Sequence, residues 1–113
     1  MNLDQFHNRT YNAKHYNCMH FMADVWLHLT NIDIRNQIES IFNEHKFKNK
    51  HMRVIQPLNE PVNPCIAVMK RPRSTPHVGI YIDGRILHLT ELGVECFPVE
   101  IAMRGFSNIR YFK

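Results

Sequence analysis

With 113 residues, the chain is long enough for one domain with a single modest core and too short for two. Hydrophobic residues make up 44% and charged residues 21%, as in ordinary globular proteins, and no apolar run approaches the roughly 20 residues of a membrane span. The formal net charge is +4, and eight histidines would add positive charge below neutral pH. Such a surface suits an anionic partner, for example cell wall or nucleic acid, without selecting one.

The cysteines and the first residues bear on the compartment. Cys18, Cys65 and Cys96 form no CxxC motif and cannot all pair, which favours a reducing compartment over a disulfide framework. Residues 1–7 have neither the basic nor the apolar region of a secretory signal. We therefore expect synthesis in the cytoplasm, and action elsewhere would need another carrier.

The first regular element is predicted to be a helix over about residues 18–30. Residues 1–16 are polar and aromatic without a clear period, and we interpret them as an arm that brings Tyr11 or Tyr16 near Cys18. Asn17 is a good N-cap, and an apolar stripe recurs at helical spacing. A thiol at the positive end of a helix is biased toward the thiolate. The stripe consists of Phe21, Met22, Val25, Trp26 and Leu29.

The middle of the chain is less regular. Asp33 is a plausible N-cap for a second helix, whose apolar stripe would be Ile34, Ile38, Ile41, Phe42 and His45. Residues 46–53 are basic, and a short strand is expected at Val54 and Ile55. Three prolines then mark a loop, because proline interrupts helices. A short buried strand is expected over residues 65–69, followed by a basic connection over residues 70–76.

The most legible stretch is a hairpin around Asp83-Gly84, a two-residue turn signal of type I′. If the turn is those two residues, Ile82 faces Arg85 and the pairing continues back to His77 opposite Thr90. Side chains then alternate between the two faces. One face carries Val78, Ile80, Ile82, Leu87 and Leu89, and the other carries His77, Gly79, Tyr81, Ile86, His88 and Thr90.

The C-terminal third predicts a strand over residues 94–97, a turn or short helical piece over 98–105, and a closing strand over 108–112. Helices come first and an antiparallel run of strands follows. The expected class is therefore α+β, with N-terminal helices packed on an antiparallel sheet in one domain, residues 1–113.

Three residues carry the chemistry that this arrangement predicts. Cys18 opens a helix, and His77 begins a strand. His88 becomes a diagonal neighbour of His77 on one face, and Gly79 leaves room for an imidazole. A cysteine and a histidine are the minimum for a thiol nucleophile with its general base.

The pattern resembles the NlpC/P60 superfamily of papain-like cysteine peptidases, including the short versions encoded with phage tail proteins. The matching parts are Cys18 at the start of its helix, the run 77–81 with Asp83-Gly84 behind it, and residues 86–88. The cysteine also precedes the histidine, unlike in circularly permuted relatives. The resemblance covers roughly residues 11–113. It departs in Asn17-Cys18-Met19-His20, where the family commonly has Asp-Cys-Ser-Gly, and in Asn63-Pro64-Cys65, where the family usually has Gly-Asp.

The resemblance implies a papain-like fold and a catalytic set of Cys18 as nucleophile, His77 as general base and His88 as the residue that orients His77. It implies cleavage of an amide bond through a thioester acyl-enzyme, most often in bacterial cell-wall stem peptides. The backbone N–H of Cys18 is a natural oxyanion donor. Tyr11 and Tyr16 both qualify as the tyrosine that assists it.

The same resemblance sets the partners that we expect. They are a peptide or peptidoglycan substrate and, in one delivery route to the cell wall, phage tail or secretion proteins. Related folds act as amidases, acyltransferases or deubiquitinases, and a papain-like fold can also serve as a non-catalytic part of a phage tail. No cofactor is expected.

Plainer interpretations stand beside the catalytic one. Cys65 and Cys96 lie in apolar runs and are expected in the core. A zinc site at His15, Cys18 and His20 with a downstream histidine matches no standard spacing, so no metal is expected. Basic segments 46–53 and 70–73 could bind nucleic acid, but no recognised motif accompanies them, which disfavours that partner.

Overall fold

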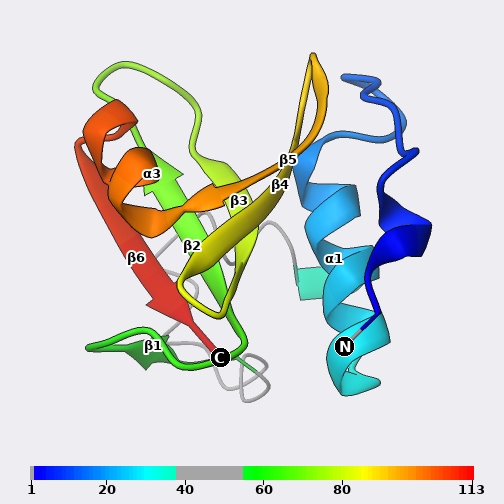
Figure 1. The fold of residues 1–113 in the computed structure, drawn as a ribbon, viewed down its shortest axis with the longest axis horizontal. Coiled ribbons are helices and arrows are strands. Elements are labelled where there is room, and N and C mark those ends of the chain that lie inside the picture. The colour runs from blue at the N-terminus through cyan, green and yellow to red at the C-terminus, as the bar shows by residue number, and fades with distance from the viewer. Residues whose placement is uncertain (1, 38–54) are drawn as a thin grey trace.

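The computed structural model describes residues 2–37 and 55–113. Over these residues the chain is α+β, as predicted (Figure 1). Two 3₁₀ turns, at Asp4–Phe6 and Arg35–Gln37, accompany the main elements. These are α1 (Cys18–Thr30), β1 (Pro57–Leu58), β2 (Cys65–Lys70), β3 (His77–Ile82), β4 (Arg85–Thr90), β5 (Gly93–Pro98), α3 (Val99–Gly105) and β6 (Asn108–Phe112).

Helix α1 has the predicted bounds because both of its ends are capped. The side chain of Asn17 accepts a hydrogen bond from the Met19 N–H at 3.0 Å, and His20 Nδ1 accepts one from the Asn17 N–H at 3.1 Å. Asn31 ends the helix in the left-handed conformation, with φ 61°. Of the predicted stripe, Leu29 is only partly buried, and the other residues are buried.

The strands form one antiparallel sheet in the order β1-β6-β2-β3-β4-β5. The predicted strands at residues 65–69, 94–97 and 108–112 are confirmed as β2, β5 and β6, and the predicted piece at 98–105 is helix α3. The prediction of a strand at Val54 and Ile55 is wrong for Ile55, and Val54 lies outside the described residues. Ile55 lies outside any strand, and the short strand is β1, which pairs with the end of β6.

The β3–β4 hairpin has the predicted register where the two strands pair. Ile82 pairs with Arg85, Tyr81 with Ile86, and Ile80 with Leu87. Asp83 and Gly84 both have positive φ, 51° and 77°, as a type I′ turn requires. The alternation of side chains between the two faces follows from this register.

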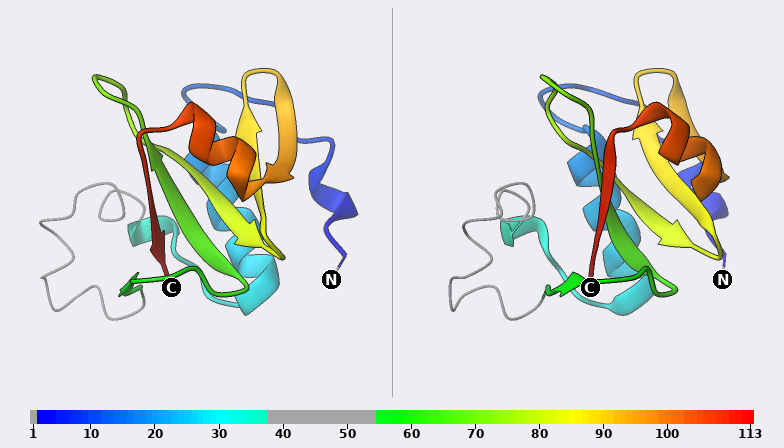
Figure 2. Two further views of the ribbon diagram at one scale, coloured as in Figure 1. Left: turned by 60° about the vertical axis from the view of Figure 1, so that its left-hand side comes forward. Right: turned by 90° about the vertical axis from the view of Figure 1, so that its left-hand side faces the viewer.

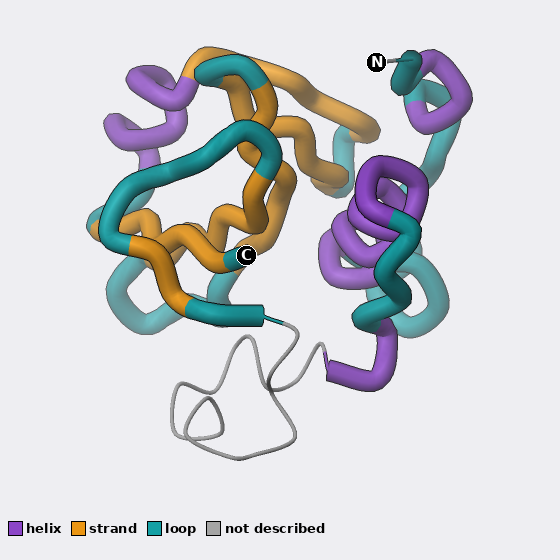
Figure 3. The backbone as a smooth tube through the Cα atoms, turned by 90° about the horizontal axis from the view of Figure 1, so that it is seen from below, coloured by secondary structure: helices purple, strands orange, loops and turns teal. Residues whose placement is uncertain are grey.

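The two faces of the sheet are covered by different helices (Figures 2 and 3). Helix α1 packs on β3 and β4, and its apolar stripe forms one core with the face that carries Val78, Ile80 and Leu87. Helix α3 lies on the opposite face, where Ala102 and Ile86 belong to a second, smaller core. Within the described ranges, neither helix has the length and apolar content that crossing a membrane requires.

Two sequence predictions about single residues have different outcomes. Cys65 is fully buried in β2, as expected, whereas Cys96 is exposed. The prediction for Cys96 is wrong because β5 is an edge strand, and α1 packs over β3 and β4 without covering it.

The predicted second helix falls mostly on residues 38–54, outside the described part of the chain. Before that gap, the Asp33 carboxylate accepts the Arg35 N–H at 3.0 Å, and Ile34 is buried in the larger core.

Candidate active site

Cys18 is the first residue of α1, and its sulfur lies where the helix start meets the head of β3. The backbone amides of Val78, Cys18 and Met19 lie near this sulfur and favour its charged form, which lowers the pKa of the thiol. Burial nevertheless raises the pKa of the Cys18 thiol, and these N–H groups offset the effect only in part. The expected bias toward thiolate is therefore wrong for the resting protein, because loss of hydration outweighs the amides of the helix start.

His77 and His88 form a hydrogen-bonded pair across neighbouring strands. His77 Nε2 lies 2.6 Å from His88 Nδ1, and the two ring planes meet at 74°. Gly79 makes this approach possible. A Cβ built on Gly79 would lie 2.8 Å from the carbonyl oxygen of Leu87 and 3.0 Å from the Cβ of His88. The sequence prediction that Gly79 leaves room for the imidazole is confirmed.

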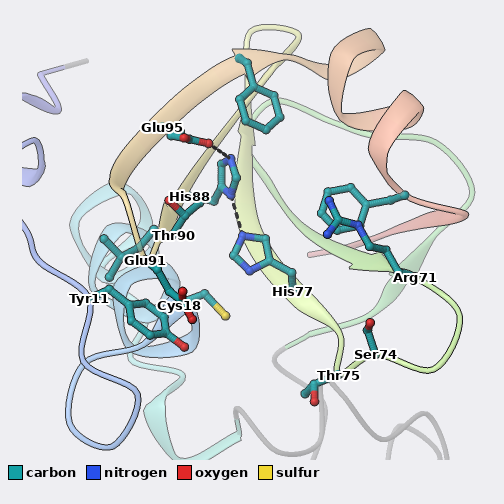
Figure 4. Close-up of a pocket in the computed structure, with 13 residues that line it drawn as sticks. Tyr11, Cys18, Arg71, Ser74, Thr75, His77, His88, Thr90, Glu91 and Glu95 are labelled. Atoms are coloured by element: carbon teal, nitrogen blue, oxygen red, sulfur yellow. Dashed lines mark hydrogen bonds and ion pairs between the residues drawn. The ribbon is translucent and has the colours of Figure 1, made fainter.

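The orientation of His77 relates it to both partners. One ring nitrogen, Nε2, is committed to His88, and the other, Nδ1, points toward the sulfur of Cys18 (Figure 4). The structure thus brings the sulfur and the two imidazoles, far apart in sequence, to one place.

Aromatic side chains hold the imidazole pair. The ring of Phe106 stacks on His77 with an interplanar angle of 3°, and the ring of Phe97 meets His88 edge-on with centroids 4.6 Å apart. The guanidinium of Arg71 lies 4.5 Å from the centre of the Phe106 ring, and its Nε donates to the Gly105 carbonyl at 2.7 Å.

Both imidazoles are neutral at pH 7. Burial, together with the positive charge of Arg71, lowers the pKa of His77 to about 4. Burial, together with the neighbouring His77, lowers the pKa of His88 to about 4. In the resting protein the thiol of Cys18 therefore keeps its proton and the imidazole of His77 is free to accept it. The proton moves from the sulfur to the ring only during the reaction.

The pair opens onto solvent through a cleft of about 360 Å³. A second hollow of about 500 Å³ also has Cys18 in its wall, together with Met19 and Pro76. The two hollows share Tyr11, Cys18, Thr75 and His77, so they adjoin beside the sulfur. The first cleft is lined also by Arg71, Ser74, His88, Leu89, Thr90, Glu91, Glu95, Phe97 and Phe106.

The two candidate tyrosines lie in different places. Tyr11 lines both hollows next to Cys18 (Figure 4). The Tyr16 hydroxyl donates to the Asp24 carboxylate at 2.6 Å and accepts from Arg9 at 2.9 Å. Burial and Asp24 raise the pKa of Tyr16 to about 12, and Tyr16 lines neither hollow. Of the two, Tyr11 alone faces the sulfur.

Sequence reasoning missed the outer residues of the cleft, above all Glu95, which lies directly opposite His88 in the β4–β5 ladder. Its carboxylate Oε2 is 3.7 Å from His88 Nε2. With a tight turn placed between Thr90 and Gly93, the antiparallel register of the two strands would have put Glu95 opposite His88. Nothing local in the sequence marks Arg71 or Phe106, because they enter the cleft from distant loops.

The metal alternative gains no support from the described residues. In residues 2–37 and 55–113, no group of three or more cysteine, histidine or acidic side chains is arranged to hold a metal ion. His15 is exposed, and His20 Nδ1 accepts the Asn17 N–H at the helix cap.

The basic face suggested as a nucleic-acid site is only partly visible. Residues 46–53 lie outside the described part of the chain, so that half of the hypothesis has no structural account. In the other half, Arg71 packs on Phe106 at the wall of the cleft.

The fold and the site together define an α+β domain with a thiol and an imidazole pair in an open cleft. No protein-family profile, curated protein or solved structure matches the chain.

Proposed function

We propose that this chain is a papain-like cysteine hydrolase of the NlpC/P60 type that cleaves an amide bond, with bacterial cell-wall stem peptides as the substrate class. The observation that carries the proposal is the convergence of Cys18, His77 and His88 on one open cleft, with the two imidazoles joined at 2.6 Å. A lone buried cysteine needs no such neighbours.

Acylation starts from the neutral pair. His77 Nδ1 takes the thiol proton as the Cys18 sulfur attacks the substrate carbonyl, and a C–S bond forms. His77, now protonated, gives that proton to the amide nitrogen, the C–N bond breaks, and the amine leaves. The product on the protein is a thioester. His88 accepts the Nε2–H of His77 throughout, which keeps Nδ1 directed at the sulfur.

The developing oxyanion needs donors near the sulfur. The backbone N–H of Cys18 is available because first-turn amides have no partner within the helix. The hydroxyl of Tyr11, which lines the cleft beside Cys18, is the second donor in this proposal. Water then attacks the thioester with His77 as base, the acid is released, and the Cys18 thiol is restored.

The choice of substrate comes from the resemblance to NlpC/P60 peptidases, and the site is compatible with it. The cleft is open to solvent and has the charged side chains of Arg71, Glu91 and Glu95 in its wall. A net charge of +4 favours approach to an anionic cell wall. If an amine rather than water took the acyl group, the same chemistry would make an acyltransferase.

The test is digestion of purified peptidoglycan by wild type, Cys18→Ala and Cys96→Ser. Release of new amino groups should be lost in Cys18→Ala and retained in Cys96→Ser, which alters an exposed cysteine outside the cleft. Circular dichroism checks that both variants fold. Equal digestion by Cys18→Ala and wild type would overturn the proposal. An absence of digestion by wild type would reject the cell-wall substrate and leave the thiol chemistry to the alkylation test described below.

A further inference from the structure

The second nitrogen of His88 is an unusual group in this fold. His88 is 3% exposed, and among the described residues its Nε2 atom is buried without a hydrogen-bond partner. A buried polar nitrogen without a partner is costly, so its surroundings matter. The charged atom that faces it is Oε2 of Glu95, the residue opposite His88 in β5. The distance from His88 Nε2 to Glu95 Oε2 is 3.7 Å (Figure 4).

The His77–His88 hydrogen bond can be made in two ways, and only one of them suits catalysis. If His77 carries its proton on Nε2 and donates to His88 Nδ1, then His77 Nδ1 is free to accept the thiol proton. If His88 carries its proton on Nδ1 and donates to His77 Nε2, then neutral His77 is protonated on Nδ1 and cannot act as the base. The distance of 2.6 Å is the same in both cases.

We propose that Glu95 is a positioning residue that selects the productive arrangement. In that arrangement His88 carries its proton on Nε2, directed at the Glu95 carboxylate. In the other arrangement, a bare nitrogen lone pair would face that negative charge, which is unfavourable. Glu95 thus acts on the Cys18 thiol through two imidazoles. This inference rests on the proposed function for its catalytic meaning, although the proton positions can be measured without it.

The other charged and titratable groups of the cleft do not pair with His88 Nε2. Glu91 also lines the cleft, from the turn after β4, but among the described residues the carboxylate paired with this nitrogen is that of Glu95. His77 approaches from β3 on the Nδ1 side, and Cys18 lies beyond it at the start of α1. Arg71, from the loop after β2, is cationic and contacts Phe106 on the far side of His77. Glu95 is the anion that faces Nε2, and its side chain is 40% exposed, so its effect is moderate.

The experiment compares wild type with Glu95→Gln, Glu95→Asp and Glu100→Gln. Long-range ¹H–¹⁵N NMR at pH 7 reads the protonated nitrogen of each histidine ring. We expect Nε2–H on both His77 and His88 in wild type and in Glu95→Asp, which keeps the carboxylate. Glu95→Gln should mix the two forms of His88, since an amide can offer either an oxygen or an N–H. Glu100→Gln, an exposed site on α3, is the charge-matched control.

A kinetic measurement completes the test. The rate of Cys18 alkylation by iodoacetamide in Glu95→Gln should fall about fivefold, the upper end for a partly exposed charge pair, and Glu95→Asp should restore it. A proton on Nδ1 of His88 in wild type, or identical His88 spectra and alkylation rates in wild type and Glu95→Gln, would overturn the inference. If the NMR result holds and peptidoglycan digestion survives Cys18→Ala, the proposed function fails and the role of Glu95 in fixing the tautomer stands.

Discussion

His77 and His88 meet across β3 and β4 with Nε2 and Nδ1 2.6 Å apart, on the sheet face that does not carry α1. Their closeness has a thermodynamic consequence as well as a catalytic one. Both rings are neutral and largely removed from water, and a charge on either would lack hydration. The pair is therefore a site at which acid should act on the fold.

Stability should fall as the pH is lowered from about 6.5 to about 4. The unfolded chain takes up protons on these histidines near pH 6.5, whereas the folded pKa values of His77 and His88 are about 4. The unfolded state thus binds more protons in that window, and the free energy of unfolding rises with pH across it. Urea unfolding at several pH values in wild type and His88→Asn measures the effect.

The comparison isolates one histidine because asparagine does not titrate and its amide can still bond to His77. In His88→Asn the pH slope should be smaller by up to about 1.4 kcal/mol per pH unit, the value for one proton. Curves of the same slope in both proteins would contradict the lowered pKa of His88.

Gly79→Ala should destabilise the fold and disturb the imidazole pair. The added Cβ would meet Ile86 Cγ2 and the Leu87 carbonyl oxygen, each at 2.8 Å, and the backbone atom cannot move aside easily. We expect the free energy of unfolding to drop by about 1–3 kcal/mol, as in overpacked cores. Chemical denaturation measures it.

The matched control is Gly105→Ala, whose new Cβ would meet only the flexible end of Arg71, at 3.5 Å. Its effect should stay within about 0.5 kcal/mol. Equal effects of the two substitutions would show that the close approach at Gly79 is not what the fold depends on.

Tyr11→Phe and Tyr16→Phe should separate catalysis from stability. Loss of an oxyanion donor should lower turnover about 100-fold in Tyr11→Phe, with little change in stability. Tyr16→Phe should leave turnover near the wild-type value and cost about 1 kcal/mol of stability, since its hydroxyl bonds Asp24 and Arg9. Initial rates on peptidoglycan and urea unfolding give both readouts. A loss of turnover confined to Tyr16→Phe would reverse the assignment.

The sequence predicted those features whose signals are local. The Asn17 cap defined the start of α1, and Asp83-Gly84 defined the hairpin. Once that turn was placed, the period of two put His77 and His88 on one face. Each of these conclusions needs only neighbouring residues and backbone geometry.

The features that failed or stayed open depend on tertiary context. Cys96 has apolar neighbours in the sequence, but it is exposed because α1 packs on β3 and β4 and leaves the edge strand β5 uncovered. The choice between Tyr11 and Tyr16 depends on the path of the N-terminal arm, which has no period to follow. The pKa of Cys18 is raised because the thiol is buried, and its position at the start of a helix does not reveal that burial.

If Cys18 and His77 work as nucleophile and base, the rate at which iodoacetamide alkylates Cys18 must depend on His77. Peptide mapping by mass spectrometry follows each cysteine at pH 7 in wild type and His77→Ala. Exposed Cys96 is an internal reference in the same molecule, and buried Cys65 reports on folding, because it should stay unmodified in both.

We expect His77→Ala to slow alkylation of Cys18 at least about tenfold while the Cys96 rate stays the same, because His77 removes the thiol proton as the sulfur reacts. Equal Cys18 rates in the two folded proteins would contradict this role of His77.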